Sequence, residues 1–269
     1  MKKCRWNLGR NFNKKREVAE LLAESFPDCR GRSVVMTPST TCFDIEAMRK
    51  CGKMNSKTLL YGFEHLRSSC FEPRMKSAYR HVLSSNPYWV GKRVVNDFLL
   101  EFKNRLHEIF GTDGFYESAR KRIVFGNILE SNLNIEFERV AYGSGFKLIY
   151  ADLCGVFNSR LLTWLCWNST IGSLSSDGKL AFTVILNRWK QESVELASDQ
   201  SCLRHPCEIS FLGEYSKECD ADYYLRKMNG IANCVENRSG RRLEVERMIH
   251  YCECDRHSQM VTVVCRKLK

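Results

Sequence analysis

The sequence has no long apolar run. No stretch approaches the roughly 18 consecutive apolar residues of a membrane span. The basic segment 1–13, which begins MKKCRWNLGR, lacks the run of about 7–15 apolar residues that a secretion signal needs. We therefore expect no membrane partner and a cytoplasmic or otherwise intracellular protein, inside the host cell if its source is a virus.

Paired cysteine motifs are also missing, although the chain has 14 cysteines. They are scattered, many of them inside apolar runs such as LTWLCWN and VTVVCRK, whereas disulfide frameworks are typical of short secreted chains. We expect most of them to be reduced and buried. The absence of paired CxxC spacing favours a protein without a structural metal. Zinc remains the alternative at two groups of side chains, namely Cys202, His205 and Cys207, and Cys252, Cys254 and His257.

Acidic residues are the minority charge: 31 Asp and Glu stand against 42 Lys and Arg, which gives a net charge of +11. This excess favours polyanionic partners such as nucleic acid. No RNA- or DNA-binding motif accompanies it, so a basic surface without that role is the alternative. The hydrophobic content of 43% is ordinary for a folded globular protein.

Hydrophobic spacing predicts alternating helices and strands. The first four elements are a helix at 14–26, a strand at 33–37, a helix at 44–50 with Thr40 or Thr41 as its N-cap, and a strand at 58–63 that ends on Glu64. The later ones are an amphipathic helix at 86–111 within a helical insertion of about 72–120, strands at 122–126, 147–151 and 179–186, helices at 158–170 and 224–236, and two β-rich runs at 241–253 and 257–269. A turn at Asp177 and Gly178 is predicted just before the strand at 179–186.

Alternation of this kind indicates an α/β fold with a doubly wound, mostly parallel sheet. The last two runs are separated by only a few polar residues, so they must pair antiparallel, with the strand near 259–267 opposed to the others. We predict one domain over 14–269 with seven strands and a C-terminal antiparallel hairpin.

This ending resembles the Rossmann-like class I methyltransferases that use S-adenosyl-L-methionine. Two short motifs are most similar to uncharacterised phage and mobile-element proteins of that class. They are D-x-C-G at Asp152, Cys154 and Gly155, and L-x-F-T at Leu180, Phe182 and Thr183.

The resemblance implies a cofactor site at the ends of the strands. The loop after the first strand, TPSTTCFD, would wrap the amino-acid part of the cofactor, Glu64 would bind the ribose hydroxyls, and Asp152 would lie at the reaction centre as cofactor contact and general base. The implied cofactor-binding residues are Thr37, Ser39, Thr40, Glu64, Asn127, Ile128 and Asp152, with Asn127 and Ile128 beside the adenine.

Two departures keep a second hypothesis open. The family's first loop contains a G-x-G pattern, whereas TPSTTCFD has no glycine. The motifs for methylating base amino groups and cytosine C5 are missing too, and Cys154 fits packing better than nucleophilic catalysis. The resemblance implies a methyltransferase, with nucleic acid as a candidate substrate. The alternative is an inactive methyltransferase-like protein that serves as a basic interaction module for nucleic acid or protein.

Overall fold

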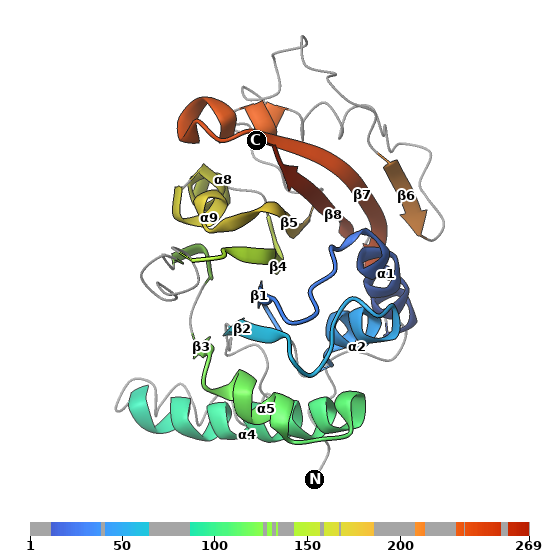
Figure 1. Ribbon diagram of the computed structural model, residues 1–269, viewed down its shortest axis with the longest axis vertical. Helices are drawn as coiled ribbons and strands as arrows, with labels where there is room; N and C mark the ends of the chain where they lie inside the picture. The colour runs from blue at the N-terminus through green and yellow to red at the C-terminus, as the bar shows by residue number, and fades with distance from the viewer. Residues whose placement is uncertain are drawn as a thin grey trace.

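The fold is taken from a computed structural model (Figure 1). It describes residues 12–38, 41–64, 87–125, 128–130, 133, 143–156, 159–166, 168–185, 208–212, 230–233, 235–253 and 258–268. The segment 1–11 lies outside these ranges, so the division into a basic segment and one domain stays a prediction.

Within the described ranges, eight strands form one sheet in the order β3-β2-β1-β4-β5-β8-β7-β6. Strands β1 to β5 run parallel, and β8 runs antiparallel to both β5 and β7. The seven predicted strands and the antiparallel hairpin are therefore confirmed, and β6 adds an eighth strand parallel to β7. The strand bounds are β1 Ser33–Met36, β2 Leu59–Glu64, β3 Ile123–Phe125, β4 Phe146–Val156, β5 Leu174–Ile185, β6 Glu208–Leu212, β7 Leu243–Glu253 and β8 Ser258–Lys267.

Helices cover both faces of the sheet, as Figure 1 shows. On one face lie α1 (Phe12–Ser25), α2 (Phe43–Lys50), α4 (Pro87–Phe110) and α5 (Gly114–Arg120); on the other lie α8 (Ser159–Cys166), α9 (Asn168–Gly172), the short 3-10 helix η2 (Ile128–Glu130) and the helical residues 230–233 and 235–239. Strand β4 contributes to both cores because its side chains alternate: Leu148 and Tyr150 join the first, and Ile149 and Ala151 join the second. The described part of the chain contains no helix that is both long and apolar enough to cross a bilayer.

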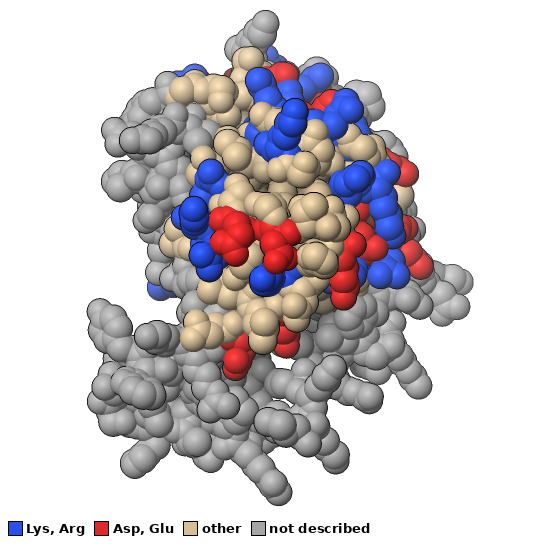
Figure 2. Space-filling model, turned by 60° about the horizontal axis from the view of Figure 1, so that its bottom comes forward, with Lys and Arg blue, Asp and Glu red and all other residues tan. Residues whose placement is uncertain are grey.

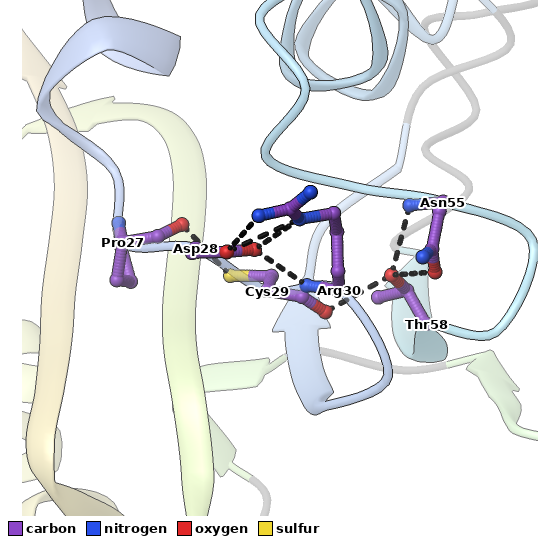
Figure 3. A network of polar contacts seen from close by, with 6 residues as sticks. All are labelled: Pro27, Asp28, Cys29, Arg30, Asn55 and Thr58. Atoms are coloured by element: carbon purple, nitrogen blue, oxygen red, sulfur yellow. Dashed lines mark hydrogen bonds and ion pairs between the residues drawn. The ribbon is translucent and has the colours of Figure 1, made fainter.

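The turn before β1 is fixed by the polar contacts in Figure 3. The buried Thr58 hydroxyl donates to the carbonyl of Cys29 at 3.0 Å and accepts from the amide of Asn55 at 3.1 Å. Asp28 accepts from the backbone amide and guanidinium of Arg30, which holds the pKa of Asp28 below its usual range. These contacts tie together the amino ends of β1 and β2, so they lie at the opposite edge of the sheet from the strand ends where ligands bind.

Three local predictions need correction. The N-cap of α2 is Cys42 and not Thr40 or Thr41, and no side chain caps the helix there. The strand predicted to end at Asp152 continues to Val156. The turn predicted at Asp177 and Gly178 lies inside β5, at a register shift beside β4.

Five cysteines have described side chains, and all five are thiols outside any disulfide. Cys29, Cys42 and Cys265 are buried, Cys166 is partly exposed and Cys51 is exposed. Burial raises the pKa of the Cys29 thiol to about 12, which makes it an inert packing residue. Three of these five thiols are buried, which agrees with the prediction that most cysteines are reduced and buried, and Cys51 is an exposed exception.

Candidate active site

The carboxyl ends of β1 and β4 form the switch point of the sheet. From β1 the chain winds outward through β2 to β3, whereas β4 leads to β5 on the other side. In open α/β sheets the crevice at such a point is where ligands bind. Thr37, which directly follows β1, joins the end of β1 to β4. Its amide donates to the carbonyl of Tyr150 at 3.1 Å, and its hydroxyl accepts from the amide of Asp152 at 2.8 Å.

Asp152 lies at an irregularity in β4. It pairs with Thr183 of β5, but the next paired residue is Gly155, so Leu153 and Cys154 form a bulge between them. Bulges re-aim side chains and are common beside active sites. The Cys154-Gly155 step thus interrupts the ladder without ending the strand, and Asp152 keeps its predicted place beside the end of β1.

A second carboxylate, Asp44, comes from the first turn of α2. Its side chain is only partly exposed. Burial, reinforced by the charge of Asp152 and opposed by Lys15, raises the pKa of Asp44 from 3.8 to about 7. A carboxyl group poised near neutrality beside a second carboxylate is typical of functional sites. The sequence offered one signal for it, because Asp44 ends the loop expected to wrap the cofactor.

Buried hydroxyl groups continue the polar site beneath these carboxylates. The Tyr150 hydroxyl lies 3.5 Å from Thr183 Oγ1, which lies 2.8 Å from Thr262 Oγ1 on β8. All three side chains are buried, and Tyr150 is 3% exposed. Burial, with the charges of Asp44 and Asp152, holds the pKa of Tyr150 well above its usual value, so this group stays a neutral phenol.

The other predicted site residues are placed by their backbones. Glu64 is the last residue of β2 and pairs with Phe125 of β3. Ile128 follows β3 in η2 and is 3% exposed. Ser39, Thr40 and Asn127 lie outside the described residues. The structure therefore brings Thr37 and Asp152 into direct contact and aligns Glu64 at the same edge of the sheet, because β1, β2 and β4 are parallel.

Metal ligands do not gather in the ranges that the structure covers: no group of three His, Cys, Asp or Glu side chains lies together there. The zinc alternatives are not part of those ranges, since Cys202, His205, Cys207, Cys254 and His257 are outside them and the Cys252 side chain is not described.

By sequence, the chain matches no protein-family model and no curated protein. By structure, it is similar to Trm5b from Pyrococcus abyssi, with a TM-score of 0.46, 10% identity, and coverage of 94% of this chain and 48% of that one. An O-methyltransferase from Bacillus cereus in complex with S-adenosylhomocysteine has a TM-score of 0.43 and 8% identity, with coverage of 95% of this chain and 81% of that one. The N-methyltransferase NodS from Bradyrhizobium japonicum in complex with S-adenosyl-L-homocysteine has a TM-score of 0.42 and 9% identity, with coverage of 99% of this chain and 93% of that one.

The chain spans about half the length of Trm5b and 57% of the length of a further solved structure of similar fold, from Nostoc punctiforme. At such low identities the likeness concerns the fold alone. The strand order with its single antiparallel strand, β8, is that of a doubly wound, Rossmann-like α/β fold.

Proposed function

We propose that the chain is an S-adenosyl-L-methionine-dependent methyltransferase whose site lies at the carboxyl ends of β1, β2 and β4. The observation that carries this proposal is the Thr37–Asp152 hydrogen bond at the switch point of the sheet, with Asp44 beside it. In open α/β sheets, this switch point at the carboxyl ends of the strands is where ligands bind.

The residues present fit the cofactor's chemistry. A carboxylate at the end of β2, Glu64, can accept hydrogen bonds from both ribose hydroxyls. The buried Ile128 gives an apolar contact for the adenine, with Asn127 beside it. Asp44 and Asp152 suit the positive charges of the sulfonium and ammonium groups. Thr37, Ser39 and Thr40 are the remaining residues of the proposed site, and they would contact the amino-acid part of S-adenosyl-L-methionine.

Two carboxyl groups are available for proton transfer. When bound, S-adenosyl-L-methionine supplies a methyl group on a positively charged sulfur, which an acceptor's lone pair takes while the carbon–sulfur electron pair stays on sulfur. Asp152 accepts the proton that the acceptor releases. The raised pKa of Asp44, about 7, makes it a second group that can hold a proton near neutral pH. Thr37 holds the backbone of Asp152 in position.

We further propose nucleic acid as the methyl acceptor, on the strength of the net charge of +11. On the face in Figure 2, basic and acidic side chains are interspersed, with carboxylates near its centre. The proposal therefore rests on net charge and not on a continuous basic groove. A catalytically silent interaction module is the second candidate, and the loop without glycine favours it.

Thermal unfolding with and without S-adenosylhomocysteine tests the proposal, because a ligand that binds only the folded state raises the melting temperature. Incubation with methyl-labelled S-adenosyl-L-methionine and bulk RNA or DNA then tests transfer. A raised melting temperature with label in the nucleic acid supports the full proposal. A raised melting temperature without incorporation argues against that acceptor, and no thermal shift leaves the silent module.

A further inference from the structure

The loop between β1 and α2 turns without glycine by placing Cys42 in the left-handed region. Cys42 has φ 50° and ψ 29°, and among the described residues it is the one non-glycine residue with positive φ. Its side chain is 2% exposed. A side chain with a Cβ atom disfavours this conformation, so surrounding contacts must hold it there.

The contacts come from Arg105 of α4, which lies 64 positions after Thr41 in the chain. Arg105 Nε donates to the carbonyl of Thr41 at 3.1 Å, directly before the strained residue. Another guanidinium nitrogen of Arg105 binds the carboxylate of Glu46, in the first turn of α2. Arg105 and Glu46 are 24% and 18% exposed, so this bond is partly shielded from solvent.

Glu46, the α2 carboxylate that Arg105 binds, has further basic partners. It also pairs with Lys50 at 2.9 Å and lies 3.7 Å from Arg16 of α1. The Arg16 guanidinium stands 5.3 Å from the centre of the Phe43 ring, next to Cys42. The loop is thus held between α1 and α4, and Arg105 is the one of these side chains that bonds both a loop carbonyl and the helix that follows the loop.

We propose that Arg105 is a positioning residue that holds the residues around Cys42 in their left-handed conformation and thereby keeps the cofactor loop ready to bind. The consequence for binding rests on the proposed function. Arg105 touches no reacting group and acts through the loop, in place of the glycines that the related loops contain.

The size of the effect follows from the strain. Holding a residue with a Cβ atom in the left-handed conformation costs free energy. Without Arg105, a relaxed loop is more stable than the binding conformation by that free energy, so a smaller fraction of the protein molecules can bind the cofactor. The free energy of one left-handed residue corresponds to a roughly 5–30-fold weaker apparent affinity for S-adenosylhomocysteine. Glycine at position 42 removes the cost, because it has no Cβ atom.

The test measures S-adenosylhomocysteine binding by calorimetry for the wild type, Arg105→Ala, Cys42→Gly and the double variant. Lys103→Ala is the matched control, because it removes another α4 cation whose partner is Asp113. We expect a 5–30-fold loss in Arg105→Ala, wild-type affinity in the control and in Cys42→Gly, and recovery to within about threefold of wild type in the double variant. If Arg105→Ala fails to fold, Arg105→Lys, which keeps the charge but loses the Nε contact, replaces it.

A ligand-free measurement separates this inference from the proposed function. The alkylation rate of Cys42, followed by peptide mass spectrometry with the exposed Cys51 as internal reference, should rise about tenfold or more in Arg105→Ala as the loop opens. If the wild type binds no ligand but Cys42 becomes reactive, the proposed function fails and Arg105 still positions the loop. Unchanged Cys42 reactivity, or a loss of affinity that Cys42→Gly does not reverse, would overturn the inference.

Discussion

Replacing Asp44 by Asn should change how the free energy of unfolding depends on pH. The folded protein holds the pKa of Asp44 at about 7, against 3.8 for an ordinary Asp. Below pH 4 the group is protonated in both the folded and the unfolded states. Between pH 4 and 7 it ionises in the unfolded chain but not in the folded one, so the wild type loses stability as the pH rises through this range. Above pH 7 both states are ionised and the loss is complete.

The magnitude follows from the distance between the two pKa values. Each pH unit is worth about 1.4 kcal/mol, which sets a ceiling of about 4 kcal/mol. Because Asp44 keeps partial contact with solvent, we expect roughly 1–3 kcal/mol after screening. Asn cannot ionise, so Asp44→Asn should gain this amount over the wild type between pH 4.5 and pH 8.

Urea denaturation at closely spaced pH values measures this difference. Asp97→Asn, which changes an exposed carboxylate on α4, is the control and should run parallel to the wild type. Asp152→Asn should reduce the pH dependence, because the charge of Asp152 helps to raise the pKa of Asp44. A constant difference between Asp44→Asn and the wild type from pH 4.5 to 8 would refute the reasoning.

Three further variants test other parts of the account. Glu64→Ala should weaken binding of S-adenosylhomocysteine by about 1.5–3 kcal/mol in calorimetry, since two hydroxyls lose a charged acceptor; equal affinity would remove Glu64 from the site. Asp152→Asn should still bind S-adenosylhomocysteine, which lacks the sulfonium charge, but should slow methyl incorporation by about 10²–10⁴-fold, and a wild-type rate would show that another group takes the proton. Thr58→Val should lower the free energy of unfolding by about 1–3 kcal/mol, because it leaves the Cys29 carbonyl and the Asn55 amide without their partner. The affinity of Thr58→Val for ligand should be unchanged, and a large loss would mean that the two edges of the sheet are coupled.

The central strands could be predicted because buried parallel strands are short apolar runs. The sequences SVVM and LLYGFE, which became β1 and β2, show this pattern and alternate with helical periodicity. Strand β6, EISFL, was missed because its pairing with β7 joins residues far apart in the chain.

The candidate site was predicted in part. The residues at the end of β1 and Asp152 could be placed in the site because each directly follows a short apolar run of the sequence. Tyr150 and Thr183 could have been found from the two-residue period of a strand, since Tyr150 shares a face of β4 with Asp152. The left-handed Cys42 gave no signal, because only Gly or Asn would suggest that conformation. The Arg105 contact with Thr41 joins residues far apart in the chain, and no local pattern predicts it.

Isothermal titration of the wild type with S-adenosylhomocysteine, alongside Glu64→Ala, tests the central claim most directly. We predict a one-to-one complex with the wild type and a clearly weaker one with the variant, while circular dichroism shows both to be folded. No heat of binding from folded wild-type protein would contradict the methyltransferase proposal and leave the Rossmann-like fold with a different role.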